Sequence, residues 1–302
     1  MGFFRRSNQL GLTAYLRLPG RLVYARVDRR AAVPRLLATG VTPVEGDDWS
    51  GALARLKGKG PVSLVLRPGD YRLRLLDAPK VPPEELKAAV RWQIQDMLDF
   101  HVDDGTIDVL RVPQPEHLSH VPQIFVVAAK NSLLAEETAL AQKAGLVLSV
   151  IDILETAQRN LVTRLETRGR ALATLAFVET GGLLTLTLDG ELCMARSLGV
   201  NPALLESDSL GGVLDRLTLE IQRSLDHFDR QFGGVPVDRL TLLPCERAGP
   251  LRDGLAGNLA LPVDTLDLAS VLDVSAIPDI AALPADCYHA IGAALRIEDT
   301  QP

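Results

Sequence analysis

The residues most able to do chemistry lie in the segment 177–198, which reads Phe-Val-Glu-Thr-Gly-Gly-Leu-Leu-Thr-Leu-Thr-Leu-Asp-Gly-Glu-Leu-Cys-Met-Ala-Arg-Ser-Leu. An apolar strand leads to Glu179, a turn with Gly181 and Gly182 follows, and Thr185 lies on the next strand. Glycines let backbone N–H groups approach a phosphate closely, and a carboxylate can hold the Mg²⁺ of a nucleotide. These four residues are therefore the candidate nucleotide-binding set. An ordinary β-hairpin explains the same pattern, because its turn also needs glycine, and local sequence alone favours this second interpretation.

Other chemistries lack a supporting set of residues. The sequence contains no Gly-x-x-x-x-Gly-Lys-Ser/Thr, no Gly-x-Gly-x-x-Gly and no Gly-x-Ser-x-Gly. Ser224 has an aspartate and a histidine nearby, but on a helix these would point away from its hydroxyl, so a polar helix face is the better interpretation. The histidines that could bind a metal lack companions at ligand spacing: His101, His117 and His120. We therefore expect no catalytic residue and no metal ligand.

Composition bounds the class of protein. The chain has 302 residues, 47% of them hydrophobic, which is enough for two packed domains. Its net charge of −6 and its 4% of aromatic residues argue against a nucleic-acid-binding protein. Three widely spaced cysteines favour a reducing cytoplasm. The sequence has no apolar run of about 18 residues, so we expect no membrane-spanning helix.

The order of elements predicts an α/β protein with two related halves. A strand-turn-strand opens each half, near residue 10 and near residue 172, and the polar stretch 168–170 is the candidate boundary. We expect further strands at 62–66, 71–76, 106–112, 123–129, 146–153, 238–243 and 263–266, and helices ending near 57 and 259 and spanning 82–98, 132–144, 156–167, 213–232 and 288–296.

The helix at 82–98 carries an aromatic residue on its polar face. Two prolines and two glutamates suit its first turn, and apolar residues recur on one side at i, i+3 and i+4. Trp92 falls on the opposite side, among Arg91, Gln95 and Asp96. A large aromatic on such a face is either covered by another domain, which we favour, or offered to a partner protein.

Several motifs, in order along the chain, resemble those of the PilM-type pilus assembly proteins. They are Val81-Pro-Pro-Glu-Glu-Leu-Lys-Ala-Ala-Val-Arg-Trp-Gln-Ile-Gln-Asp-Met-Leu98, Val126-Val-Ala-Ala-Lys130, Ala144-Gly-Leu146, Val150-Ile-Asp152, Leu219-Glu-Ile-Gln-Arg-Ser-Leu-Asp226 and Tyr288-His-Ala-Ile-Gly-Ala-Ala-Leu-Arg296. The resemblance implies an actin-like ATPase fold, similar to FtsA, with two ribonuclease-H-like lobes and an inserted subdomain. It implies a flexible N-terminus at 1–9, a first lobe at 10–169 with the insert at about 77–145, a second lobe at 170–297 and a tail at 298–302.

The same resemblance implies a partner. In this family a groove beside the inserted subdomain receives the cytoplasmic N-terminus of a PilN-like inner-membrane protein, and the assembly ATPase is a further candidate partner. Contact with the membrane would be indirect, through those partners. We expect Arg91, Trp92, Gln95 and Asp96 to form part of the partner surface.

Three loops depart from the nucleotide-binding pattern of that family. The first phosphate loop, placed at 11–15, lacks the Asp-x-Gly; the second has Glu179 in place of Asp; the adenosine-side loop, 244–249, is not rich in glycine. Loss of a Mg²⁺-binding acid and of close-approach glycines removes contacts that a triphosphate needs. We therefore expect a non-catalytic scaffold that needs no cofactor, with weak or absent ATP binding. The alternative is a nucleotide-dependent switch in which Glu179 and Thr185 still position Mg²⁺.

Overall fold

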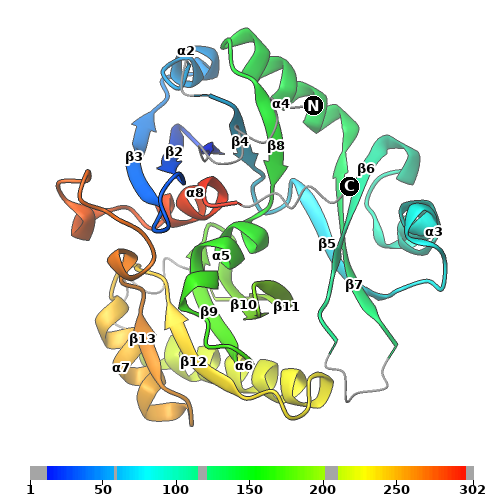
Figure 1. Cartoon of the computed structure of the whole chain (residues 1–302), viewed down its shortest axis with the longest axis vertical. Coiled ribbons are helices and arrows are strands. Elements are labelled where there is room, and N and C mark those ends of the chain that lie inside the picture. Colours follow the sequence, from blue (N-terminus) through cyan, green and yellow to red (C-terminus); the bar gives the residue numbers. More distant parts are fainter. Residues whose placement is uncertain (1–11, 58–59, 115–120, 201–209, 297–302) are drawn as a thin grey trace.

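The computed structural model describes residues 12–57, 60–114, 121–200 and 210–296. Two five-stranded sheets form the cores of two lobes, and a smaller three-stranded sheet branches from the first lobe (Figure 1). The N-terminal segment 1–9 and the tail 298–302, both expected from the sequence, lie outside the described residues. No helix in the described ranges is both long enough and apolar enough to cross a bilayer.

The first lobe is built on a sheet with strand order β3-β2-β1-β4-β8. A hairpin opens it, and Gly20 supplies the positive φ of 68° that its two-residue turn requires. Strand β3 is a strand that the sequence did not predict, because its residues are mostly half-buried and show no clear alternation. The elements are β1 (Thr13–Leu18), β2 (Arg21–Asp28), β3 (Arg35–Pro43), α2 (Trp49–Ala54), β4 (Val62–Val65), α4 (Asn131–Lys143) and β8 (Leu148–Asp152).

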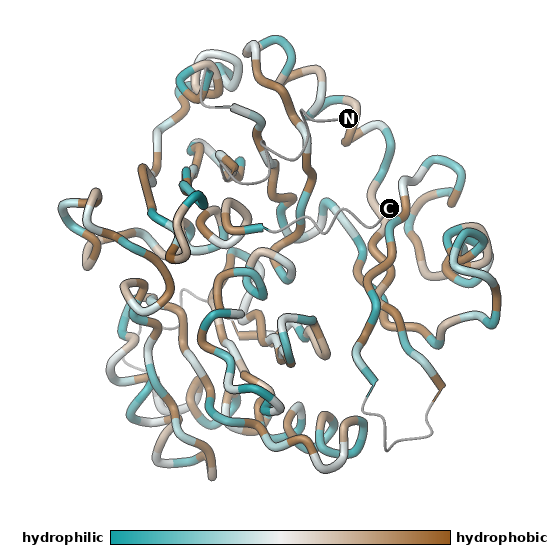
Figure 2. The backbone as a smooth tube through the Cα atoms, viewed as in Figure 1, coloured by the Kyte–Doolittle hydropathy of each residue, from teal (hydrophilic) through white to brown (hydrophobic). Residues whose placement is uncertain are grey.

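The second lobe repeats this plan. Its sheet has strand order β11-β10-β9-β12-β13, which matches the first sheet strand for strand, so the two related halves are confirmed. Hydrophobic and hydrophilic residues alternate along the turns of its longest helix in Figure 2, as the 3.6-residue period predicted. The elements are β9 (Ala171–Val178), β10 (Gly181–Leu188), β11 (Glu191–Leu198), α6 (Leu210–Gln231), β12 (Val237–Leu242), α7 (Ala248–Asn258) and β13 (Val263–Thr265).

The inserted subdomain is a three-stranded antiparallel sheet, ordered β5-β7-β6, with one helix on one face. Val90 and Ile94 of that helix are buried against Ile124 and Val126 of the central strand. The elements are β5 (Tyr71–Asp77), α3 (Leu86–Ile94), β6 (Gly105–Arg111) and β7 (Gln123–Lys130), with 3-10 helices at Pro83–Glu85, Gln95–Met97 and Val102–Asp104.

The bounds of the insert differ from the expected 77–145 at both ends. It starts at Tyr71, because the whole of β5 pairs with β7. It ends near Lys130, because α4 packs on the first lobe: Ala141 shares a buried cluster with Leu53, and Arg17 of β1 donates to Glu137 at 2.5 Å. Helix α4 therefore belongs to the first lobe, and the insert is shorter than the sequence suggested.

Two helices are exchanged between the lobes. Helix α5 (Leu154–Val162) follows the last strand of the first lobe, yet its Gln158 donates to the carbonyl oxygen of Thr174 in the second lobe at 3.0 Å. Helix α8 (Cys287–Ala294) follows the second lobe but packs against β1 and β2, so the expected second lobe, 170–297, loses its last helix to the first. The remaining 3-10 helices are Thr163–Leu165, Leu268–Ser270 and Ile280–Ala282.

The exchanged helices touch at one glycine. A Cβ atom on Gly292 of α8 would lie 2.0 Å from the carbonyl oxygen of Ala157 on α5, a distance that no side chain can adopt. Ala290, Ala293 and Ala294 around it are fully buried, and small side chains of this kind let the two helices approach closely. A polar contact crosses the same junction, where His289 Nε2 lies 3.3 Å from Gln158 Oε1.

We expect Gly292→Ala to destabilise the protein strongly, because the new methyl group meets backbone rather than a mobile side chain. The free energy of unfolding should fall by about 3 kcal/mol or more, at the upper end of overpacking effects. Urea unfolding followed by circular dichroism measures this. The matched control is Gly257→Ala on α7, where nothing lies within 4 Å, so stability should be unchanged or slightly raised. Equal effects of the two substitutions would contradict close packing at the junction.

Burial lowers the pKa of His289 to about 4. The unfolded chain takes up a proton near pH 6.5, its ordinary value, while the folded chain takes it up only near pH 4. Stability is therefore lost as pH falls from about 6.5 to 4, by about 2–3 kcal/mol. Urea unfolding of His289→Gln over this range should show a shallower dependence on pH. His227→Gln, at an exposed side chain, should behave like the parent protein. Parallel curves for all three proteins would overturn the prediction.

Candidate functional site

The hairpin at Glu179 is a two-residue turn between β9 and β10. Glu179 and Thr180 are exposed at its tip, and Gly181 pairs with Val178. Gly181 has φ 138°, and a Cβ atom there would lie 2.5 Å from the carbonyl oxygen of Leu198 at the end of β11. The hairpin thus needs glycine at 181 for its own conformation and packing, whether or not a ligand is bound.

Thr185 is turned into the protein interior. It is fully buried, and its hydroxyl accepts a hydrogen bond from Gln158 Nε2 at 2.8 Å. Counted along β10, it lies about 13 Å from Gly181, at roughly 3.3 Å per residue. The structure therefore brings Glu179, Gly181 and Gly182 together at one turn and assigns Thr185 to the contact with α5.

The prediction that the first phosphate loop lies at 11–15 was wrong. Residues 13–15 belong to β1, and Thr13 and Tyr15 are buried there. Because the two sheets share one strand order, the counterpart of the turn at Glu179 is the turn at Pro19 and Gly20. Proline offers neither a carboxylate nor a backbone N–H. The turn at Pro19 and Gly20 thus lacks the acid of the Asp-x-Gly pattern, as residues 11–15 also do.

The adenosine-side loop lies where expected, between β12 and α7. Arg247, the residue that precedes α7, has φ 57°, in the left-handed region that glycine usually occupies. Cys245 in the same loop is partly buried, and burial raises the pKa of its thiol to about 11.

A cavity of about 370 Å³ lies beside the hairpin, between the lobes and the insert. Thr180 and Gly182 line one side of it, and Tyr71 and Glu155 line another. Tyr71 Oη donates to Glu155 Oε2 at 2.5 Å, and burial raises the pKa of that carboxyl group. The sequence did not reveal this pair, because its members are 84 residues apart on two different elements.

The oxygen donors at the hairpin, on β10 and at the start of α5 do not fit the Mg²⁺ ion of a bound triphosphate. The turn of the first lobe that is equivalent to the Glu179 turn carries a proline and no second carboxylate. The Glu155 carboxylate accepts a hydrogen bond from Tyr71, and the Thr185 hydroxyl accepts one from Gln158. Across 12–57, 60–114, 121–200 and 210–296, no three His, Cys, Asp or Glu side chains gather in a cluster able to hold a metal ion.

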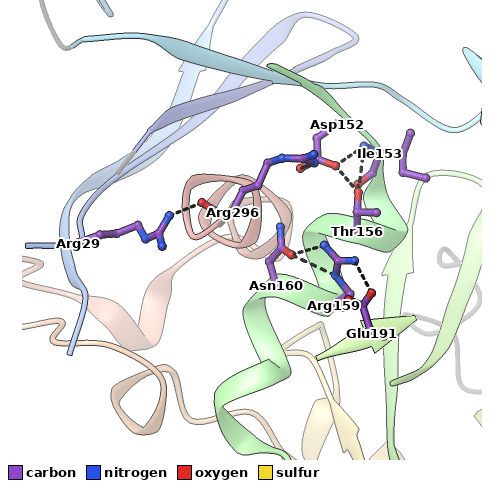
Figure 3. A network of polar contacts seen from close by, with 8 residues as sticks. All are labelled: Arg29, Asp152, Ile153, Thr156, Arg159, Asn160, Glu191 and Arg296. Carbon is purple, nitrogen blue, oxygen red and sulfur yellow. Dashed lines mark hydrogen bonds and ion pairs between the residues drawn. The ribbon is translucent and has the colours of Figure 1, made fainter. Parts of the chain in front are cut away.

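Charged side chains between the lobes form hydrogen bonds and ion pairs that hold α5 and α8 in place (Figure 3). Arg29 of the first lobe donates to the carbonyl oxygen of Arg296 at the end of α8, and Arg296 Nη1 lies 3.2 Å from Asp152 Oδ2. Arg159 of α5 reaches Glu191 of β11 at 3.4 Å. The polar groups between the lobes thus hold the helices in place.

The partner surface predicted on α3 lies on the outer side of the insert, away from both large sheets (Figure 1). The Trp92 side chain is 76% exposed, so the expectation that another domain covers it was wrong. Gln95 and Asp96 are also exposed, and Met97 beside them is 44% exposed. Arg91 instead donates to the carbonyl oxygen of Gly105 at 3.2 Å, so it helps to hold α3 on the sheet.

A further cavity lies beside the insert. A cavity of about 200 Å³ separates the insert from the first lobe, with Asp99 and Phe100 on one side and Leu133 on the other. Lys130 Nζ lies 5.6 Å from the centre of the Phe100 ring, so a cationic and an aromatic group line the cavity together.

The remaining sequence candidates do not form a site. Ser224 is buried and donates to the carbonyl oxygen of Glu220 at 2.7 Å, an ordinary helix contact. His101 Nδ1 accepts from the backbone N–H of Asp103 at 3.4 Å. The two other histidines considered as metal ligands lie outside the described residues, at His117 and His120.

No protein-family model matches the chain, and no curated protein matches it. Among solved structures, a chain of a PilM–PilN type IV pilus biogenesis complex is similar over 96% of this chain and 100% of its own, with a TM-score of 0.74 and 19% identity. The cytoplasmic domain of EpsL, an inner-membrane component of the type II secretion system of Vibrio cholerae, is similar over 94% and 95%, with a TM-score of 0.51 and 12% identity. The chain thus has the actin-like ATPase fold, with two lobes built on sheets of the same order.

Proposed function

We propose that the chain is a non-catalytic cytoplasmic scaffold of a type IV pilus assembly platform, and that it binds a PilN-like inner-membrane protein. The observation that carries the proposal is the exposed Trp92 on the insert of a chain whose fold matches a PilM–PilN component over nearly its whole length. Exposed tryptophans of this kind are typical anchors of protein interfaces.

Two surfaces of the insert supply the contacts. Trp92 and Met97 offer apolar area on the outer side of α3, beside the carboxylate of Asp96. The cavity between the insert and the first lobe adds Phe100 and Lys130, which suit a short extended segment with apolar side chains. The assembly ATPase of the same machine is a further candidate partner for the outer surface.

We further propose that the chain serves the system of mannose-sensitive haemagglutinin pili. The pairing of Arg91 and Trp92 on α3 with Asp96 on the 3-10 helix that follows resembles the pattern of MshI, the biogenesis protein of those pili. Arg91 makes two hydrogen bonds to the Gly105 carbonyl oxygen, which help to fix the orientation of the helix that presents Trp92.

The non-catalytic part of the proposal rests on the phosphate loops and on the buried Glu155 of α5. Pro19 stands where the first lobe would need an acid, and Glu155 is bonded to Tyr71 rather than free to orient a water molecule. A second function, a nucleotide-dependent switch, is favoured by the 370 Å³ cavity beside Glu179, because it lies between bodies whose relative angle could change.

We expect a synthetic peptide with the cytoplasmic N-terminus of a PilN-like protein encoded nearby to bind the purified chain in calorimetry. Trp92→Ala should weaken binding by about tenfold or more, because a buried tryptophan anchor contributes about 2 kcal/mol. Leu219→Ala, which truncates an exposed leucine of α6, is the matched control and should leave the affinity unchanged. Absence of binding, or equal affinities for both variants, would refute the adaptor function.

Titration with ATP and Mg²⁺ distinguishes the scaffold function from the nucleotide-dependent switch. We expect calorimetric titration to give no binding in the micromolar range, since the loops lack the carboxylate partner that Mg²⁺ needs. Glu84→Ala, at an exposed acid of the insert, serves as the control for Glu179→Ala. Micromolar binding of ATP that is lost only in Glu179→Ala would replace the scaffold with the switch.

A further inference from the structure

A second groove lies on the far side of the inserted sheet from α3. It has a volume of about 490 Å³ and separates the insert from the second lobe. We call it the α6 groove, after the helix that forms most of one wall. Its lining residues are Leu73, Leu75, Phe125, Met194, Ala195, Arg196, Arg223, His227, Arg230 and Gln231.

One wall of the α6 groove is apolar. Leu75 of β5 pairs directly with Phe125 of β7, so their side chains share one face of the inserted sheet. Leu76 and Ile124, the next pair along, point to the other face, which α3 covers. Leu75 is 36% exposed, so this face of the sheet is only partly covered by the second lobe.

The opposite wall is basic. Arg223, His227 and Arg230 recur at i, i+4 and i+7 and thus form one stripe along α6. Arg196 of β11 adds a further cation, and no Asp or Glu is among the lining residues. The stripe is exposed on the side of α6 opposite Phe228, which is fully buried in the second lobe.

Among the described residues, one ion pair reaches these cations. Glu220 Oε1 lies 2.9 Å from Arg223 Nη1 on the exposed surface of α6, and Arg196 donates to the Ser224 hydroxyl at 3.1 Å. No ion pair forms at Arg230 within the described parts of the chain. The groove thus keeps a concentration of positive charge on a chain whose net charge is −6.

We propose that the α6 groove binds an acidic peptide segment of a partner protein, with carboxylates toward α6 and apolar side chains toward β5 and β7. Guanidinium groups bind carboxylates in charge-assisted, often bidentate hydrogen bonds. The apolar wall suits alternate side chains of an extended segment. A nucleic acid is the less suitable occupant, because its charged backbone would meet Leu75 and Phe125 on one side.

Binding in the α6 groove would join the insert to the second lobe whether or not the chain functions in pilus assembly. The two sides of the groove already meet in one hydrogen bond, between the side chains of Gln231 at the end of α6 and Gln123 at the start of β7. A bound segment would add contacts to both walls, so it would fasten the insert to the second lobe. The α6 groove is thus a second attachment point, on the opposite face of the sheet from Trp92.

Fluorescence anisotropy tests the proposal with the full chain. The probe is a fluorescein-labelled peptide of about eight residues that alternates glutamate with leucine, extended at about 3.3 Å per residue. We expect saturable binding that weakens as salt is added. The double variant Arg223→Glu with Arg230→Glu should reduce the affinity by about tenfold or more, since two charge-assisted contacts become repulsive. Leu75→Ser, at the partly exposed position of the apolar wall, should also weaken binding.

The control variant carries the same change of charge elsewhere. Arg168→Glu with Arg252→Glu alters two exposed arginines that do not line the groove, and it should bind the probe like the parent chain. Trp92→Ala should also bind normally, which separates this site from the surface on α3. Circular dichroism of each variant excludes unfolding as the cause of a loss. Absence of saturable binding, equal losses in both double variants, or preference for a labelled oligonucleotide over the peptide would overturn the proposal.

Discussion

The contact between α5 and α8 is the constraint on which the rest of the structure depends. Each helix follows one lobe in sequence and packs on the other, so the faces of the two sheets that meet α5 and α8 are covered only when both helices are in place. They approach so closely that Gly292 leaves no room for a methyl group beside the Ala157 carbonyl. Because the core of the first lobe includes a helix from the C-terminal end of the chain, the two lobes cannot be separate folding units.

This junction also engages several polar side chains that lie between the lobes. Gln158 uses its amide to reach two strands of the second lobe, and one of its acceptors is the hydroxyl of Thr185. Asp152 at the entry to α5 is bound to Arg296 at the exit of α8. An unmade hydrogen bond at such a buried position would cost about 1–3 kcal/mol. These side chains therefore stabilise the helix exchange.

Much of the architecture could be predicted from the sequence, because local patterns carry it: the period of α6, the glycine turns, and the strand-turn-strand at the start of each half. What the sequence could not give depends on contacts between distant residues. Strand β3 is half-buried without alternation, and α8 joins the first lobe only through its packing on α5. The engagement of Glu155 by Tyr71 depends on β5 and α5 meeting in space. The prediction that the first phosphate loop lies at 11–15 was wrong for a different reason. Threonine and tyrosine occur both in loops and in buried strands, and Thr13 and Tyr15 are buried in β1.

The inserted sheet is a single layer of three strands, and each of its faces belongs to a different surface of the molecule. Alternate side chains of β5 and β7 point to α3 on one face and to the α6 groove on the other, so the two surfaces share the same three strands. Both surfaces are thus positioned by one backbone. Any free energy by which one occupant changes the affinity of the other must be the same in both directions. Coupling between ligands bound at the exposed tryptophan and at the basic groove would therefore pass through these three strands.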